Sequence, residues 1–191
     1  MTSIHARLLT VAVTLLAALG VISPASAATS PYCGLTWGSF PKAASAGSET
    51  DLVTGVRAGR HDCFDRLVVD LRGSRDTTFG SYEVRYVPVV LADGSGKPIP
   101  VRGAVDLQVV LRAPSYDQDG HATFAPADPQ EMVSVSGYST FRQVASAGSF
   151  EGYTTIALGV RARLPFRVFT LAGVPQSDRG PRLVIDVAHR W

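Results

Sequence analysis

The sequence predicts an antiparallel all-β domain, and three observations lead to this fold class. From Leu52 onward, apolar and polar residues alternate in short runs, with the period of a half-buried strand. Glycine, proline and aspartate separate these runs, as turn residues do between strands. No stretch keeps the 3.6-residue period of a helix. Alternation alone permits either a β-sandwich or a closed β-barrel, because both have a period of two residues.

The first 27 residues have the order of a Sec-type signal peptide. A polar start containing Arg7 precedes an apolar run from Leu8 to Ile22, and small residues follow up to the expected cleavage after Ala27. The apolar run is shorter than the roughly 20 residues that a membrane-spanning helix needs. We therefore expect a secreted protein, extracellular or associated with the cell wall, whose mature chain has no membrane span.

The two cysteines, Cys33 and Cys63, are expected to form a disulfide, because an even pair in an exported chain is most simply bonded. A redox or metal pair is the alternative, but the C-x-x-C spacing typical of such sites is missing. The bond would tie an N-terminal lead, residues 28–50, to the main domain at residues 51–191. The lead is rich in glycine, serine, alanine and proline.

Strands are expected where the alternation is clearest, and the best example runs from Val105 to Arg112. The strand that begins at Tyr82 should end at Pro88 or lie at the edge of a sheet, since proline cannot donate to a β-ladder. Residues 92–96, Ala-Asp-Gly-Ser-Gly, have the composition of a hairpin turn. Other expected half-buried strands cover residues 67–71, 156–160 and 183–187, with weaker candidates at 52–60, 82–87 and 166–171.

No metal site, cofactor or catalytic centre is expected. The acidic loop at 116–131 lacks the glutamate that a calcium loop needs at position twelve, where this chain has Asp128. The histidines His61, His121 and His189 have no metal-ligand spacing, and no G-x-S-x-G elbow occurs. We therefore expect a non-enzymatic protein with a solvated loop at 116–131.

The charge of the chain excludes nucleic acid as the main partner. Lys and Arg number 18 against 16 Asp and Glu, giving a formal net charge of +2. Phosphate binding needs clustered cations, and this sequence contains no run of Lys or Arg.

One pattern occurs twice: Arg66-Leu-Val-Val-Asp-Leu returns as Arg182-Leu-Val-Ile-Asp-Val. In a strand, the Arg and the Asp of each copy point to the same face, opposite the core. They form either a surface ion pair or, if the two strands lie side by side, a polar stripe suited to a ligand.

These segments resemble the AMIN-like domains of secreted actinobacterial proteins. The resemblance covers about Leu52 to His189 and is carried by residues 56–71 (VRAGRHDCFDRLVVDL), 150–152 (FEG), 166–169 (FRVF) and 181–187 (PRLVIDV). It implies a β-sandwich related to the AMIN modules of cell-wall amidases and secretins, which bind peptidoglycan and have no catalysis of their own.

The resulting functional hypothesis is a module that binds peptidoglycan or another wall polymer. Arginines flanked by exposed aromatic side chains suit sugar rings and carboxylates, so Arg66, Arg167 and Arg182 are the candidate ligand-binding residues. AMIN modules normally accompany an amidase or secretin domain, and these 191 residues contain no pattern for one. The alternative is therefore an envelope protein–protein interaction module that regulates or localises a partner enzyme.

Overall fold

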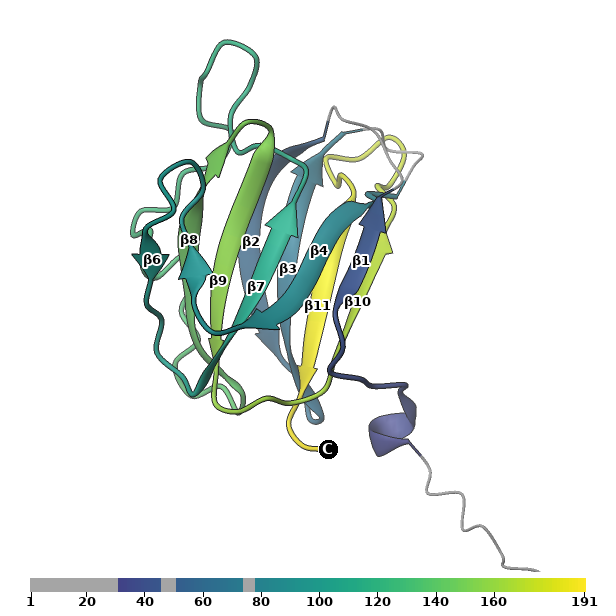
Figure 1. Ribbon diagram of the computed structural model, residues 1–191. Helices are drawn as coiled ribbons and strands as arrows, with labels where there is room; N and C mark the ends of the chain where they lie inside the picture. Colours follow the sequence, from purple (N-terminus) through teal and green to yellow (C-terminus); the bar gives the residue numbers. More distant parts are fainter. Residues whose placement is uncertain (1–30, 46–50, 74–77) are drawn as a thin grey trace, which may run out of the picture.

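The computed structural model describes residues 31–45, 51–73 and 78–191 and consists of two antiparallel sheets packed face to face (Figure 1). The β-sandwich is confirmed. Neither sheet closes on itself: the larger ends at β1 and β8, and the smaller at β10 and β2. The alternative of a closed barrel is therefore wrong.

The larger sheet has five strands in the order β1-β4-β7-β9-β8. A separate two-stranded hairpin, β5 and β6, lies beside it at the left of Figure 1. The strands are β1 (Lys42–Ser45), β4 (Ser81–Val87), β5 (Val90–Leu91), β6 (Pro98–Ile99), β7 (Val105–Leu111), β8 (Phe141–Phe150) and β9 (Tyr153–Val160).

The smaller sheet has four strands in the order β10-β11-β3-β2 and lies behind the larger one in Figure 1. Its strands are β2 (Leu52–Arg60), β3 (Phe64–Arg72), β10 (Phe166–Leu171) and β11 (Arg182–Ala188). The central strands β3 and β11 are far apart in the sequence and pair in antiparallel register.

The core fills the space between the sheets with the inward side chains of each strand. Leu67 and Ile185 of the smaller sheet and Leu107 and Ile156 of the larger one are each 0% exposed. Removing one such aliphatic side chain from water stabilises the fold by about 1.5–3 kcal/mol. The period-two alternation thus selects which face of each sheet becomes the core.

Several local predictions are confirmed. The strand expected from Val105 is β7, and β4 ends at Val87, immediately before Pro88. The turn at residues 92–96 joins β5 to β6, with Gly94 and Gly96 at φ of 72° and 64°. Glycine takes this left-handed conformation without the steric penalty that a side chain brings.

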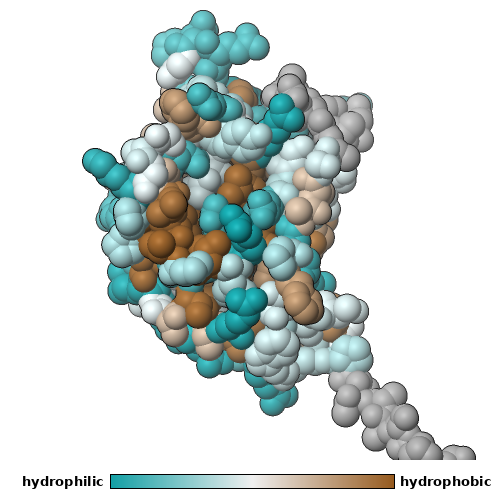
Figure 2. All heavy atoms as spheres, viewed as in Figure 1, coloured by the Kyte–Doolittle hydropathy of each residue, from teal (hydrophilic) through white to brown (hydrophobic). Residues whose placement is uncertain are grey.

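The expectation that β9 and β11 are half-buried is wrong. On β9, the outward Ala157 is 0% exposed because it packs with Ala145, Ala147 and Val90 under the β5–β6 hairpin. Hydrophobic residues gather on this part of the face in Figure 2. On β11, the outward Val184 and Asp186 are 1% and 0% exposed. Side chains from other segments therefore cover part of the outer face of each sheet.

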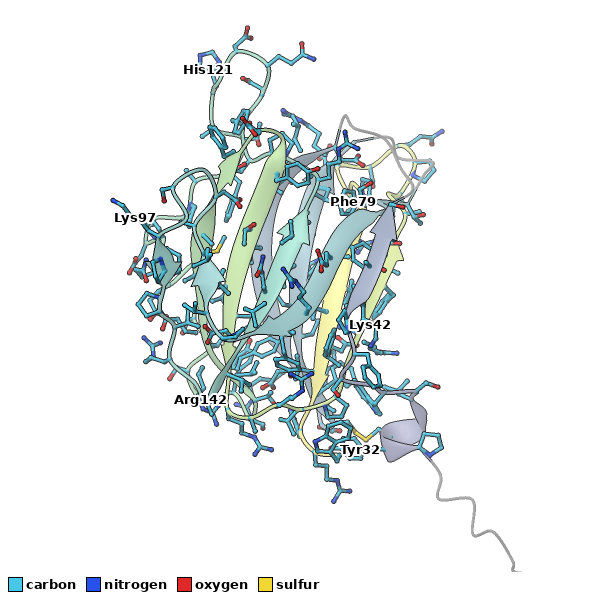
Figure 3. The ribbon with its side chains drawn as sticks, viewed as in Figure 1. Tyr32, Lys42, Phe79, Lys97, His121 and Arg142 are labelled. Atoms are coloured by element: carbon cyan, nitrogen blue, oxygen red, sulfur yellow. A yellow bond between two sulfur atoms is a disulfide. The ribbon has the colours of Figure 1, made fainter. Side chains whose placement is uncertain are left out.

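The described part of the N-terminal segment is attached by a disulfide, by strand β1, and by a backbone bridge in which the Phe166 N–H donates to the Gly38 carbonyl at 2.8 Å. The Cys33–Cys63 disulfide is present, with a Cα–Cα distance of 6.4 Å, and joins the 3₁₀ turn η1 (Tyr32–Gly34) to the β2–β3 connection. Figure 3 shows it beside Tyr32. Strand β1 pairs with β4 at the edge of the larger sheet. The cleavage expected after Ala27 falls outside the described residues.

Candidate functional site

The two copies of the repeated pattern are neighbours in the smaller sheet. Asp186 lies opposite Arg66, and Arg182 lies opposite Asp70, on either side of a central valine pair. Because the strands are antiparallel, the two copies are related by a local two-fold axis through that pair. The four charged side chains alternate with core residues along their strands and so lie on the outer face.

Asp186 is the centre of an ion-pair cluster. Arg66 donates from Nε and Nη2 to the two carboxylate oxygens, at 2.6 and 2.9 Å. Arg167 of β10 donates to the same carboxylate from Nε at 2.7 Å. Asp186 has no exposed surface, whereas the side chains of Arg66 and Arg167 are 25% and 28% exposed. Two cations thus share one buried anion and retain one positive charge at the surface.

Aromatic rings hold the two guanidinium groups in place. Arg66 lies over Phe64 and Phe169, at 5.1 and 5.5 Å from their centroids. Arg167 lies 4.9 Å from Phe169 and 5.7 Å from Trp37. Cations at these distances are attracted by the faces of the rings. The arginine–aromatic face, defined as these five residues with Asp186, therefore presents charged groups and aromatic rings side by side.

An aromatic pocket adjoins this face. It has a volume of about 320 Å³ and is lined by Tyr32, Trp37 and Trp191 together with Pro31, Leu35, Thr36 and Pro165. Trp37 belongs to both the pocket and the arginine–aromatic face, and its indole Nε1 donates to the Tyr32 carbonyl at 2.8 Å. Trp191 is 71% exposed. The pocket offers ring surface beside two cations.

The predicted site residue Arg182 does not join Arg66 and Arg167. Its cross-strand neighbour Asp70 instead accepts two hydrogen bonds from Arg57, at 2.7 and 3.0 Å. This side-chain hydrogen bonding raises the pKa of Arg57. Within the described part of the chain, the Arg182 side chain donates only to the Ala172 carbonyl, at 3.4 Å from Nη2. The structure therefore places Arg182 at the other end of the outer face.

Two histidine clusters occur away from this face. His189 Nε2 lies 3.1 Å from Oδ1 of the buried Asp65, whose Oδ2 accepts the backbone N–H of Thr140 at 2.5 Å and that of Phe141 at 3.1 Å. This carboxylate joins β3 to the start of β8 in the opposite sheet. Its contacts are those of a structural group.

His121 lies near the tip of the extended loop at the top of Figure 3. One imidazole nitrogen of His121 and one carboxylate oxygen each of Asp117 and Asp119 lie within 4.8 Å of one another. Oδ1 of Asp117 accepts the backbone N–H groups of Asp119 and His121, and this lowers the pKa of the carboxyl. The loop stabilises its own turn with that oxygen.

Sequence reasoning expected exposed aromatic side chains beside the arginines but did not assign Phe64, Phe169 or Trp37 to particular ones. Phe64 and Phe169 each lie two residues from a predicted arginine, Arg66 and Arg167, and therefore share its face. The period-two rule would have identified both. Trp37 had no comparable signal, because its approach to the sheet depends on the path of the N-terminal segment after the disulfide.

Within the residues that the structure describes, no helix is long and apolar enough to span a membrane. Comparisons with curated proteins and with solved structures find no significant match in either. The model of the AMIN-like domain family, in contrast, matches residues 51–189. The match includes both copies of the repeated pattern and every strand from β2 to β11. The chain therefore belongs to the AMIN-like domain family.

Proposed function

We propose that this protein is a secreted, non-catalytic module of the cell envelope that binds peptidoglycan or another wall polymer. Its family supports the coarser part of this proposal, because AMIN-like domains generally serve as binding modules of the wall or envelope. One observation carries the specific part. Trp37 joins the aromatic pocket to the arginine–aromatic face, so ring surface and cationic donors form one continuous surface.

The aromatic pocket suits sugar rings. The apolar face of a pyranose stacks on an indole or phenol ring, while its hydroxyl groups remain available to polar neighbours. Trp191, with 71% of its surface exposed, can present such a ring to a polymer without prior rearrangement of the fold. The volume of about 320 Å³ is at the lower end of the range typical of small-molecule sites, so the pocket would hold one unit of a longer chain.

The arginines would bind the acidic groups of the polymer. A guanidinium has five N–H donors, and Asp186 engages only Nε and Nη2 of Arg66 and of Arg167. The Nη1 groups remain for a lactyl or peptide carboxylate. Because Asp186 orients both guanidinium groups beforehand, a ligand would not have to order these long side chains on binding.

The proposed export and location outside the cytoplasm are supported by two other features, the N-terminal residues and the disulfide. The signal peptide proposed for residues 1–27, cleaved after Ala27, would deliver the chain across the membrane. The Cys33–Cys63 disulfide fits an oxidising compartment outside the cytoplasm. We propose that the mature protein acts at or outside the cell wall.

Co-sedimentation of the purified, oxidised protein with insoluble peptidoglycan, over a series of salt concentrations, tests the proposal. We expect saturable binding that Trp191→Ala weakens about three- to tenfold, the loss of one stacked ring. Arg167→Gln should weaken binding and reduce its dependence on salt, because exposed charges are screened by ions. Both variants must first show an unchanged fold by circular dichroism.

Phe150→Ala is the matched control, because this ring is 51% exposed and lies on the β8–β9 hairpin of the other sheet. It should leave binding unchanged. The proposal is wrong if the protein stays in the supernatant at low salt, or if Phe150→Ala weakens binding as much as Trp191→Ala.

An apolar patch favours the second candidate function, an interaction module for an envelope protein. Val89, Leu91 and Phe150 are 38%, 48% and 51% exposed beside the β5–β6 hairpin, where hydrophobic residues gather in Figure 2. A photo-cross-linker at Leu91 should then capture one defined protein in intact cells, and one at Trp191 should not. The same products from both positions would contradict this function.

A further inference from the structure

A polar groove of about 460 Å³ lies at the opposite end of the outer face from the aromatic pocket. Arg57, Arg179 and Arg182 line it together with Asp70 and Asp178, which leaves one positive charge in excess. Asp70 is already neutralised, since Arg57 donates to both of its oxygens at 2.7 and 3.0 Å. The groove therefore attracts an anion in spite of its two acids.

Arg182 is the unusual member of this groove. Among the residues that the structure describes, its buried Nε–H has no hydrogen-bond partner, and its Nη2 makes only the 3.4 Å contact with the Ala172 carbonyl. A buried donor of a charged group without an acceptor is unfavourable by more than a typical hydrogen bond. Rotation of the side chain toward the groove would bring Nε–H and Nη2–H to an incoming acceptor.

The local two-fold axis indicates what that acceptor is. Arg66 occupies the position equivalent to Arg182, and the Asp186 carboxylate accepts from its Nε and Nη2 together. The equivalent acid, Asp70, pairs with Arg57 of β2 instead. Arg66 therefore has a carboxylate that accepts from its Nε and Nη2 together, whereas the equivalent arginine, Arg182, has none among the described residues.

We infer that this groove binds a carboxylate group of a ligand, which accepts from Nε and Nη2 of Arg182 as Asp186 does from Arg66. A peptide that ends in a free carboxylate is the simplest such ligand. A planar carboxylate matches the planar guanidinium fork. A phosphate dianion would leave one negative charge unbalanced, because the groove has only one cation in excess of its acids. The inference names a ligand group for the proposed wall-binding module but does not depend on the aromatic pocket.

Arginine side-chain NMR tests this directly, because the ¹H–¹⁵N signal of each Nε–H reports its acceptor. The probe is N-acetyl-alanyl-alanine, added to the full, oxidised protein labelled with ¹⁵N-arginine. The Arg182 signal, identified by its loss in Arg182→Gln, should move in a saturable way. Arg182→Gln should weaken binding of the probe, followed on backbone amides, at least about tenfold, as expected for losing a charge-assisted bidentate pair.

The amidated form of the same dipeptide is the ligand control and should leave the Arg182 signal in place. Arg85→Gln is the protein control: this arginine pairs with Glu83 on the larger sheet, and its loss should not affect binding. The inference is overturned if the amide moves the signal equally, if inorganic phosphate saturates it at lower concentration than the dipeptide, or if no saturable shift occurs.

The two proposals can fail separately. Loss of peptidoglycan co-sedimentation with an intact dipeptide response would reject the wall-binding function and keep the carboxylate site. If co-sedimentation depends on Trp191 but the Arg182 signal does not respond to the dipeptide, the wall-binding function is kept and the carboxylate site is rejected.

Discussion

Arg66 and Asp186 are joined across β3 and β11 by two parallel hydrogen bonds of 2.6 and 2.9 Å, although Asp186 has no exposed surface. A carboxylate removed from water in this way is stable only when its charge and its lone pairs are satisfied. Arg167 provides the second half of that compensation. The same arrangement that stabilises the acid also fixes two arginines at the surface.

Replacing Asp186 by Asn should strongly destabilise the protein. The side chain keeps its shape but leaves Arg66 and Arg167 without a counter-charge, and breaking a buried pair in this way costs about 3–5 kcal/mol. The free energy of unfolding from urea denaturation measures the loss. Asp70→Asn is the control, because the Asp70 and Arg57 side chains are 33% and 55% exposed and such pairs contribute about 1 kcal/mol or less. Equal losses in the two variants would refute this account.

The double substitution Cys33→Ser with Cys63→Ser should lower the free energy of unfolding by about 3–4 kcal/mol, the chain-entropy value for closing a loop of this length. The sequence separation of the two cysteines is 30. It should also weaken binding to peptidoglycan, because Trp37 would lose the nearby attachment that holds it against Phe64 at 5.9 Å. Unchanged urea midpoints for the oxidised protein and the variant would contradict the prediction.

Gly159→Ala should be among the most disruptive small substitutions. A Cβ at this position of β9 would overlap the carbonyl oxygen of Arg102, which crosses the outer face of the sheet. Overpacking of this kind typically costs about 1–3 kcal/mol. At Gly38 a Cβ would meet only the Lys42 ammonium, at 3.7 Å, so Gly38→Ala should have little effect. Thermal unfolding of both variants would show whether the Arg102 segment can move away.

The buried hydroxyl of Tyr86 should make the free energy of unfolding fall as the pH becomes strongly alkaline. The hydroxyl donates to the Leu164 carbonyl at 2.7 Å, and burial raises its pKa to about 12 from 10.0. The folded state therefore holds this proton more tightly than the unfolded state does. Its contribution is complete below about pH 10 and is lost as the pH rises toward about 12, by roughly 1.4 kcal/mol for each pH unit of difference between the two pKa values.

The variant Tyr86→Phe isolates this effect. It lacks the titrating group, so its urea midpoint should fall less than that of the wild type between pH 9 and pH 11. A parallel decline in both proteins would assign the alkaline loss of stability to other groups.

The sequence predicted the buried faces of the strands but not the covering of their outer faces. The strands containing Leu107 and Leu67 were predicted because alternation marks their buried faces directly. The outward faces of β9 and β11 were expected to be wet. Ala157 and Val184 are apolar on those faces, but what covers them comes from distant parts of the chain.

The candidate site divides in the same way. Arg66 and Arg167 were identified from the sequence, and the structure brings them to one carboxylate, whereas Arg182 lies apart. Its separation follows from the antiparallel register of β3 and β11, which places Arg182 opposite Asp70 and Arg66 opposite Asp186. No local pattern records that register, because it joins strands that are far apart in the chain.

The sequence by itself determined the β class, the inward face of each principal strand and the family, since each depends on local periodicity or on the order of short motifs. The disulfide followed from the presence of two cysteines in a chain expected to be exported. Only the tertiary structure decided that the two Arg–Asp segments face each other in antiparallel register, and that Trp37 lies against Arg167. Strand pairing and side-chain stacking join residues far apart in the chain. The packing of the whole fold therefore determines both. The buried Asp186 is an example, because its carboxylate is stable only where Arg66 and Arg167 come together from two other strands.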